Sequence, residues 1–367
     1  IDGDTVVIGA YEDDSKRGSA YIFRTTDGGA TYGQVAKLTA SDAAADDRFG
    51  GSVAIDADTI VVGASYENQS SGGGYGFHTT NGGATYGQVA KLTARWPSIR
   101  GPAAGDYFGW SVAIDGGTIV IGARGDDEGS SRSGPDYVLL TTDGGATYGQ
   151  VAKLTASDAS SSDYFGTSVA IDGNTIVVGA YYKDDSTGAV YVFRASDGGV
   201  TYSQVAKLTA SDAAVNDNFG ISVAIDGDAV AISGGGSVYI FRTTDGGGTW
   251  PRVAKLVASD GVSISRVAIS GDVVVAGASG EDSIASYVFR TTAGGATYGQ
   301  VAKLTAAAAA AWDRFGRPVA IDGDTVVIGA YEDDSKRGSA YIFRTTDGGA
   351  TYGQVAKLTA SDAAADD

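Results

Sequence analysis

The sequence lacks cysteine and methionine, and it contains one histidine, His78. The absence of cysteine excludes disulfides and thiolate chemistry. A Ser-His nucleophile pair would have to use His78, which stands where other repeats carry arginine, so that chemistry is excluded as well. Position 1 is isoleucine and no signal-peptide pattern is visible, so we expect a processed or excised piece of a longer chain.

Proline and positive charge are also scarce. Five prolines against 56 glycines indicate many tight turns and no proline-rich linker. The formal charge of −18 predicts repulsion from nucleic acid and from anionic membranes, and leaves divalent cations or cationic surfaces as partners. Apolar runs have strand length and fall short of the ~20 residues of a membrane span, so no membrane insertion is expected.

A sixteen-residue string, TTDGGATYGQVAKLTA at residues 25–40, organises the rest of the chain. It recurs nearly unchanged six more times, beginning at Thr79, Thr141, Ala195, Thr243, Thr291 and Thr345. Such internal similarity indicates a repeat architecture. Each unit of about 53 residues contains four short β-branched or alternating runs, FGxSVAID, TIVVGA, AYVFR and QVAKLTA, which is typical of a four-stranded antiparallel propeller blade.

The predicted fold class is therefore all-β, a seven-bladed β-propeller of four-stranded antiparallel blades. We expect a single domain over residues 1–367, with units that begin near residues 1, 49, 108, 165, 219, 265 and 315. A helical solenoid is excluded because no 3.6-residue period is present.

The two ends of the chain share one sequence, because residues 1–47 are identical to residues 321–367. This identity indicates either a recent duplication or, as we favour, a window from a tandem array with a period of 320 residues. Strands two to four occur seven times, whereas the first strand is complete six times. An incomplete blade exposes unpaired backbone groups, so the sequence predicts self-association, head to tail, into a filament.

Two motifs resemble known families. Phe49-Gly50 followed by Val62-Gly63-Ala64, repeated in register along the chain, resembles the FG-GAP repeat of integrin α-subunit propellers and of bacterial and algal surface proteins. The resemblance implies a seven-bladed propeller at an extracellular or cell-surface location. The proline of GAP is replaced here, by Tyr11, Ser65, Arg124 and Tyr181.

The repeated turn is similar to the Asp-box, [ST]-x-D-x-G-x-T-[WFY]. This resemblance implies a structural turn between the third and fourth strands, whose Asp and Thr side chains can bond backbone groups within it. The corresponding aspartates are Asp27, Asp143, Asp197, Asp245 and Asp347.

Asp-boxes are common in sialidases, so a sialidase-like glycosidase is one hypothesis. It requires convergent arginines, an acid and a nucleophile. The strand-end arginines occupy one repeat position, and equivalent positions around a propeller point in different directions; they are Arg24, Arg194, Arg242, Arg290 and Arg344. The sequence alone therefore predicts no enzyme.

Acidic loops are candidate Ca²⁺ ligands, because carboxylate oxygens suit that ion. The candidates are Glu12, Asp13, Asp14, Asp126, Asp127, Asp184 and Asp185. The DxDxDGxxD spacing of integrin-type calcium sites is missing, so solvated acidic loops are the alternative. Asn68-Gln69-Ser70 is a glycosylation sequon on a predicted exposed loop, and Arg124-Gly125-Asp126 matches an integrin-binding tripeptide, mostly by chance.

The function expected from sequence is a non-enzymatic extracellular structural or adhesive propeller that forms a filament or tandem array. The alternative is a lectin-like or integrin-like adhesion propeller that binds glycans, and a glycosidase comes third.

Overall fold

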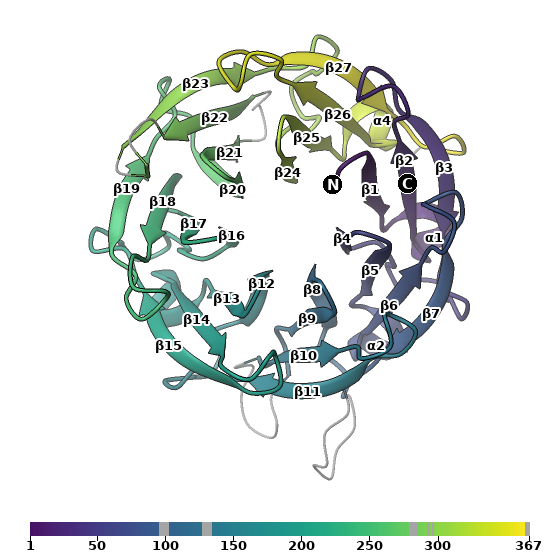
Figure 1. Cartoon of the computed structure of the whole chain (residues 1–367). Helices are drawn as coiled ribbons and strands as arrows, with labels where there is room; N and C mark the ends of the chain where they lie inside the picture. Colours follow the sequence, from purple (N-terminus) through teal and green to yellow (C-terminus); the bar gives the residue numbers. More distant parts are fainter. Residues whose placement is uncertain are drawn as a thin grey trace.

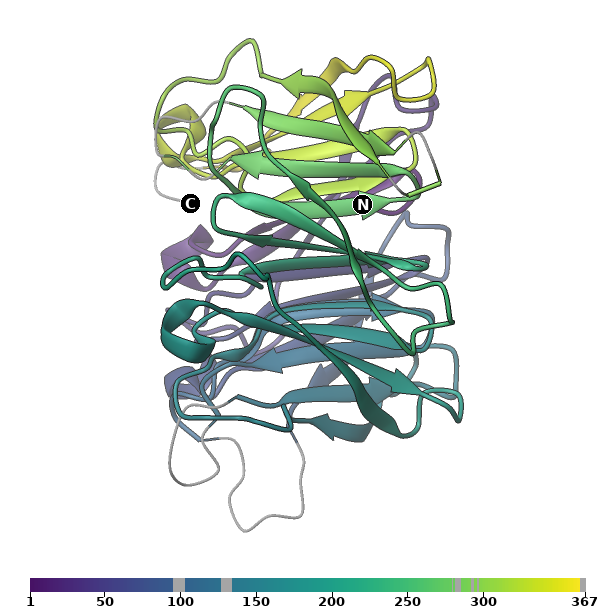
Figure 2. The same ribbon diagram turned by 90° about the vertical axis from the view of Figure 1, so that its left-hand side faces the viewer.

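The computed structural model describes residues 1–94, 103–126, 134–278, 280, 285–291, 294–295 and 297–363. Seven antiparallel sheets surround a common axis (Figure 1), which confirms the predicted β-propeller. Six sheets have four strands each, and the sheet β1-β2-β3 has three, in agreement with the strand count from the sequence. Seen from the side, the short helical turns lie on one face of the disc (Figure 2).

Each four-stranded blade runs from an inner strand near the axis to an outer strand at the circumference (Figure 1). The inner strands are β4 (Ser52–Asp56), β8 (Phe108–Asp115), β12 (Phe165–Asp172), β16 (Ser222–Asp226), β20 (Ile264–Ser270) and β24 (Val319–Asp322). The second strands are β1 (Thr5–Ala10), β5 (Thr59–Ala64), β9 (Thr118–Ala123), β13 (Thr175–Ala180), β17 (Ala229–Gly234), β21 (Val273–Ala278) and β25 (Thr325–Ala330).

The third strands are β2 (Ser19–Arg24), β6 (Gly73–His78), β10 (Asp136–Leu140), β14 (Ala189–Ala195), β18 (Ser237–Arg242), β22 (Ser286–Thr291) and β26 (Ser339–Arg344). The outer strands are β3 (Gly33–Leu38), β7 (Gly87–Leu92), β11 (Gly149–Leu154), β15 (Tyr202–Leu208), β19 (Arg252–Leu256), β23 (Tyr298–Leu304) and β27 (Gly353–Leu358). Short helical turns follow four second strands: α1 (Asp13–Lys16), α2 (Glu67–Ser70), α3 (Lys183–Ser186) and α4 (Asp333–Lys336).

Burial explains the strand sequences. The second strand β5 is buried along its whole length because neighbouring blades cover both of its faces, and it is a continuous run of small and β-branched residues. The outer strand β3 alternates between exposed and partly buried positions, because only one of its faces packs inward. The core is therefore divided into clusters that lie between adjacent blades.

The Phe-Gly pair forms the contact between blades. The ring of Phe49 is 0% exposed and lies 5.5 Å from the ring of Tyr75 in its own blade, while it packs on Ala20 of the preceding blade. Gly50 has φ of +93°, and a Cβ there would lie 2.3 Å from the carbonyl oxygen of Ser19. Glycine is therefore required sterically as well as conformationally. Equivalent buried rings are those of Phe108, Phe165, Phe219 and Phe315, and Ile264 takes the place in blade 6.

The hairpin turn between the third and fourth strands is held by its own side chains. The Asp27 carboxylate accepts hydrogen bonds from the backbone N–H of Ala30 and of Thr31, both 2.9 Å, and from the Thr31 hydroxyl at 2.6 Å. These bonds, with that of the Thr31 hydroxyl first, hold the pKa of Asp27 below its usual range. Asp143, Asp197, Asp245 and Asp347 accept the corresponding backbone bonds in their blades.

A circle of hydrogen bonds joins the turns between the inner and second strands. The Asp2 carboxylate accepts from the backbone N–H of Ala57 in the next blade at 2.6 Å, and the same bond recurs around the ring. The acceptors after Asp2 are Asp56, Asp115, Asp172, Asp226, Ser270 and Asp322. The bond from the Gly3 N–H to Asp322, 2.7 Å, closes the circle between blade 7 and blade 1.

A second inter-blade contact lies near the rim. Asp42, in the loop after an outer strand, accepts a hydrogen bond from the Tyr75 hydroxyl of the next blade at 2.8 Å and pairs with Lys91 at 2.5 Å. Asp158, Asp260 and Asp362 make the same pair of contacts in their blades. At the junction of blades 6 and 7 the corresponding position is Ala308.

Ala308→Asp is expected to add the missing contact, with Tyr341 and Lys357 of blade 7 as partners. Because the pair is largely exposed, we expect a gain in unfolding free energy of about 0.5 kcal/mol, decreasing as salt is added. Urea unfolding of the wild type and the variant at low and high ionic strength measures this gain. A loss of stability at low salt would contradict the expectation.

Asp136 is a buried carboxyl group on β10. It is 0% exposed, and neither of its carboxyl oxygens has a hydrogen-bond partner among the described residues. Burial raises the pKa of Asp136 well above the usual value. The equivalent positions are occupied by Ala20 in blade 1 and Ala340 in blade 7. Asp136 is therefore a destabilising departure from the repeat.

Asp136→Ala is expected to stabilise the protein at neutral pH. The folded state binds a proton more tightly than the unfolded state, so the wild type loses stability as pH rises above the unfolded pKa. We expect similar stabilities near pH 4 and an advantage of about 1–3 kcal/mol for the variant at pH 8, measured by urea unfolding. The converse control, Ala20→Asp, should be destabilising at pH 8, and equal stability of Asp136→Ala and wild type at pH 8 would refute the expectation.

Candidate functional site

The structure places the predicted calcium ligands apart from one another, because each acidic loop belongs to a different blade. Asp13 accepts a hydrogen bond from the Tyr21 hydroxyl at 3.0 Å and pairs with Lys37 at 2.6 Å, whereas the neighbouring Asp14 pairs with Arg17 at the surface. These carboxylates are engaged by side chains of their own blade. Asp13 thus fixes the loop to the sheet.

The remaining acidic candidates are spread over blades 1, 3 and 4. Asp126 is buried and accepts a hydrogen bond from the Tyr137 hydroxyl at 2.6 Å, while Asp184 and Asp185 are exposed. Glu12 is half-buried, and Asp127 lies outside the described residues. Within the described part of the chain, no three His, Cys, Asp or Glu side chains gather to hold a metal ion. Calcium binding stays a prediction.

The two short motifs differ in exposure. Asn68 is exposed in a loop with φ of +47°, so its side chain is accessible, and its glycosylation stays a prediction. Gly125 and Asp126 of the Arg-Gly-Asp tripeptide are buried. That tripeptide is therefore not displayed for an integrin.

The strand-end arginines do not converge, as the sequence predicted. The guanidinium of Arg24 donates to the carbonyl of Gly82 in the hairpin turn of the next blade, and Arg290 and Arg344 do the same with Gly348 and Gly28. They link neighbouring hairpins around the ring.

A different set of side chains does converge, at the face where the second strands end and the inner strands begin. We call this set the inner rim. Its members come from the residues that follow β1, β5, β9, β13 and β25, from those beside the Phe-Gly pairs, and from β20 in blade 6. They are Tyr11, Arg48, Tyr66, Tyr107, Trp110, Arg124, Tyr164, Tyr181, Arg266, Arg317 and Tyr331.

Arginines and aromatic rings alternate along the inner rim. The Arg48 guanidinium carbon lies 4.3 Å from the ring centre of Tyr66 and 5.8 Å from that of Tyr11. The Arg124 guanidinium carbon lies 3.1 Å from the centre of the Trp110 ring and 5.7 Å from that of Tyr164. Stacking of this kind holds a guanidinium in place while its N–H edges remain available as donors.

The rings also contact one another. Tyr66 and Tyr107 meet edge to face at 5.4 Å, and Tyr164 stacks on Tyr181 at 6.1 Å. The contacts extend from blade 1 to blade 4, so one continuous aromatic surface carries both Arg48 and Arg124. Such a surface is rigid, which positions the charges before any ligand binds.

Burial changes the electrostatics of the inner rim. It lowers the pKa of Arg124, because a half-buried guanidinium is partly removed from water. Burial and the nearby Glu12 raise the pKa of Tyr11, and burial raises that of Tyr181. Elsewhere in the inner rim, burial lowers the pKa of Arg266, and the positive charge of the neighbouring Arg317 lowers it further. The arginines stay charged, since their pKa in proteins lies far above neutral pH.

These charges have no acidic partners. Within the described residues, Arg48, Arg124 and Arg266 form no ion pair with a carboxylate, although the chain has 44 acidic residues against 26 basic ones. The Nε atom of Arg124 is buried without a hydrogen-bond partner. A buried donor without a partner is costly, and an anionic ligand would satisfy it.

Two cavities adjoin at Tyr11. One, of about 180 Å³, is lined by Tyr11, Arg48, Gly51, Ser65, Tyr66 and Trp110. The other, of about 160 Å³, is lined by Tyr11, Glu12, Tyr331, Glu332 and Lys336. Of the predicted site residues, Glu12 alone lines either cavity. The inner rim therefore combines a polar, aromatic binding surface with a carboxylate beside it.

Sequence reasoning missed the inner rim because its arginines occupy unrelated repeat positions. Arg48 precedes a Phe-Gly pair, whereas Arg124 follows a second strand. One sequence feature could have indicated the inner rim. The residues at the proline position of GAP include Tyr11, Arg124 and Tyr181, which are bulky where a small turn-forming residue is usual.

Comparison with protein families gives a match to the FG-GAP repeat, over residues 1–23, 32–77, 86–139, 148–193, 202–241 and 298–343. The chain belongs to the FG-GAP repeat family. The matched segments contain the second and third strands of every blade except blade 6, so the family assignment and the propeller agree. No curated protein sequence matches the chain.

Solved propellers resemble this FG-GAP protein over nearly their whole length. The Pseudomonas aeruginosa periplasmic gluconolactonase PpgL is 14% identical with a TM-score of 0.65, and 97% of this chain and 96% of that one are covered. A Bacteroides uniformis protein named "putative 6-phosphogluconolactonase" is 12% identical, with a TM-score of 0.66 and coverage of 97% and 96%. Saccharomyces cerevisiae Sqt1 is 13% identical, with a TM-score of 0.52 and coverage of 97% and 82%. At these identities the shared property is the fold.

These comparisons correct the function expected from sequence. The prediction of a non-enzymatic structural or adhesive propeller is wrong, because propellers of the same size and arrangement are named as lactonases. The physical error was to treat all equivalent positions as divergent. The strand-end arginines at the outer edge of the ring do point in different directions. The inner-rim side chains, in contrast, contact side chains of neighbouring blades. An extracellular location and self-association stay predictions, and no described helix has the length and apolar character needed to cross a membrane.

Proposed function

We propose that this FG-GAP propeller hydrolyses lactones of sugar acids, with the substrate bound at the inner rim between blades 1 and 3. The observation that carries the proposal is the pair Arg48 and Arg124, held on aromatic rings and, among the residues that the structure describes, without carboxylate partners in an acidic protein. A half-buried guanidinium without a counter-ion favours an anionic ligand. The aromatic faces suit the C–H surface of a sugar ring.

The same groups suit the reaction. Lactone hydrolysis adds water to the ring carbonyl carbon, and the bond from that carbon to the ring oxygen then breaks, leaving a carboxylate and a hydroxyl group. Negative charge develops on the carbonyl oxygen, and a fixed donor such as the guanidinium of Arg124, which stacks on Trp110, would stabilise it. The Glu12 carboxylate beside Tyr11 is the candidate base, which takes a proton from water and returns one to the departing ring oxygen.

The comparisons add support for the substrate class, which rests first on the arginines of the inner rim. Two of the similar propellers are named as a gluconolactonase and a 6-phosphogluconolactonase. Both names refer to lactones of sugar acids, and the second refers to a substrate with a phosphate group. An arginine-lined site would recognise that phosphate.

Hydrolysis of D-glucono-δ-lactone and of its 6-phosphate tests the proposal. We expect a rate above the spontaneous one in buffer, and a loss of kcat/KM of about 100-fold in Arg124→Gln, because one donor to the developing oxyanion is removed. Arg17→Gln is the matched control, since Arg17 forms an exposed pair with Asp14 and lies outside the inner rim.

Circular dichroism and thermal unfolding establish that each variant is folded. A folded wild type that leaves the spontaneous rate unchanged for both lactones would refute the proposal. Equal activity of Arg124→Gln and wild type would show that the reaction does not take place at the inner rim.

A further inference from the structure

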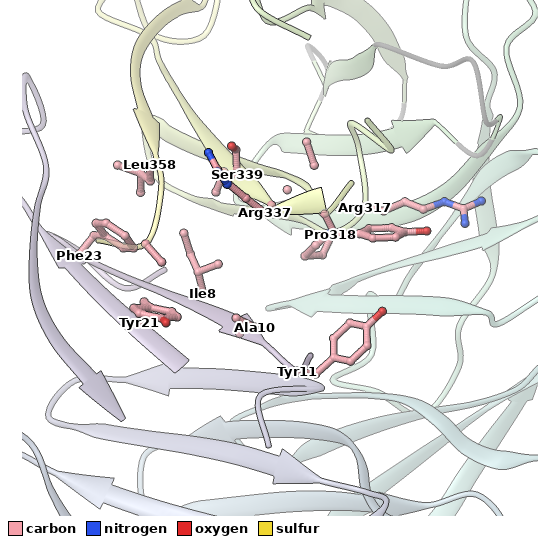
Figure 3. Close-up of a pocket in the computed structure, with 17 residues that line it drawn as sticks. Ile8, Ala10, Tyr11, Tyr21, Phe23, Arg317, Pro318, Arg337, Ser339 and Leu358 are labelled. Atoms are coloured by element: carbon pink, nitrogen blue, oxygen red, sulfur yellow. The ribbon is translucent and has the colours of Figure 1, made fainter. Parts of the chain in front are cut away.

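Two further cavities differ in the chemistry of their lining. The smaller, of about 100 Å³, lies between blades 7 and 1 and is mostly apolar, with Ile8, Phe23 and Leu358 facing it (Figure 3). The larger, of about 760 Å³, is an open groove on the face that carries the short helical turns (Figure 2). We call it the blade-4 groove. Its volume lies within the range of about 300–1,000 Å³ that is usual for small-molecule sites.

Three segments of the chain form the blade-4 groove. The turn α3 of blade 4 supplies Asp184, Asp185 and Ser186, and Tyr182 stands just before it. The loop before β12 supplies residues 160–163, and the loop before β16 supplies residues 215 and 216. Among the described residues, no lysine or arginine lines the groove. It therefore favours an uncharged ligand that can make hydrogen bonds over an anionic one.

A backbone contact that joins the corresponding segments of blades 1 and 2 is absent here. The N–H of Asp46 donates to the Ser15 carbonyl at 3.4 Å, which links the turn of blade 1 to the loop before β4. The equivalent residues at the blade-4 groove are Asn216 and Asp185. No backbone hydrogen bond joins these two within the described part of the chain, so the turn and the loop stay apart.

The serine hydroxyls of the groove are available to a ligand. Ser160 and Ser161 are exposed, and the loop before β4 has alanine at both equivalent positions, so the fold does not require these hydroxyls. Within the described residues, the Ser160 hydroxyl has no hydrogen-bond partner, and the Ser161 hydroxyl reaches that of Ser162 at 3.5 Å. A hydroxyl both donates and accepts, which suits the hydroxyl groups of a sugar.

Tyr182 connects the blade-4 groove to the inner rim. Its ring is 44% exposed and meets the rings of Tyr164 and Tyr181 edge to face, with centres 4.9 and 4.5 Å away. The ring centre of Tyr164 lies 5.7 Å from the guanidinium carbon of Arg124. Steps of 5.7 and 4.9 Å place the Tyr182 ring within about 11 Å of that guanidinium, a separation that two linked sugar rings can span.

We propose that the blade-4 groove binds an uncharged sugar ring of a substrate whose sugar-acid end lies at the inner rim. The substrate is then the lactone of a disaccharide acid, with the acid unit at Arg124 and the glycosyl unit against Tyr182. This inference rests on the proposed function, because the inner rim determines where the acid unit lies.

The lining suits the glycosyl unit on each of its sides. The C–H face of a pyranose ring can pack on the aromatic ring of Tyr182. Its hydroxyl groups can donate to the exposed carboxylates of Asp184 and Asp185 and exchange hydrogen bonds with the serines on the opposite loop. A phosphate or carboxylate in the same place would meet these two carboxylates with no cation in the lining.

Calorimetry with gluconate, maltobionate and cellobionate tests the blade-4 groove, because the second and third acids add one glucose unit to the first. None of them contains a lactone, so binding is measured without turnover. We expect at least one of the disaccharide acids to bind about tenfold or more tightly than gluconate, because the added ring contacts Tyr182 and the serines.

Two variants locate the added sugar ring. Ser160→Ala combined with Ser161→Ala gives the loop the residues of its counterpart before β4, so the fold should be kept. Tyr182→Ala removes the aromatic face. In each variant the ratio of the two affinities should fall to nearly one. Ser259→Ala, which changes an exposed serine in the loop before β20, is the matched control and should keep the wild-type ratio. Circular dichroism establishes that each variant is folded.

Absence of a preference for either disaccharide acid, including absence of binding, would overturn the proposal, as would a wild-type ratio in both groove variants. Displacement of the disaccharide acid by calcium chloride would assign the groove to a cation and would overturn it as well. A protein that prefers a disaccharide acid but hydrolyses no lactone would refute the proposed function and leave the groove. Hydrolysis of D-glucono-δ-lactone without that preference would refute the groove alone.

Discussion

The contact between one blade and the next is the interaction on which the rest of this propeller depends. A single blade has too little core to be stable alone, so its apolar faces must be covered by its neighbours. The Phe-Gly pair provides that cover, because the ring of Phe49 fills the space between two blades and Gly50 allows their backbones to approach. The hydrogen bonds from the Asp2 and Asp56 carboxylates to turns of the next blade then fix the orientation of each blade relative to its neighbour.

The difference between repeated and variable positions explains where the candidate site lies. The residues that repeat in every blade are used for packing, for the hairpin turns and for the links between blades. Arg48 and Arg124 stand at positions whose residue varies from blade to blade, and they lie at the face where inner strands from several blades begin. Because aromatic rings hold them and no carboxylate of the described residues pairs with them, they form a local positive site in a protein of charge −18.

Much of the fold could be predicted from the sequence, since periodicity reports on structure that every blade shares. The strands, the hairpin turns around Asp27 and the place of Phe49 all follow from residues that recur in register. The candidate site could not be found in that way. Its residues lie at positions that vary among the blades, and nothing in their spacing shows that Arg48 and Arg124 meet the same aromatic surface. Nor could the sequence show that Asp13, in an acidic loop, contacts Tyr21 and Lys37 of its own blade.

The central claim is that the inner rim binds the anionic groups of a sugar-acid substrate. A crystal structure of the protein with 6-phosphogluconate, the product of the proposed reaction on the phosphorylated lactone, tests it most directly. The account predicts a carboxylate or phosphate oxygen within hydrogen-bond distance of the Arg124 guanidinium, with the sugar against Tyr66 or Trp110. A ligand bound elsewhere, or an inner rim that stays empty at saturating concentration, would contradict it.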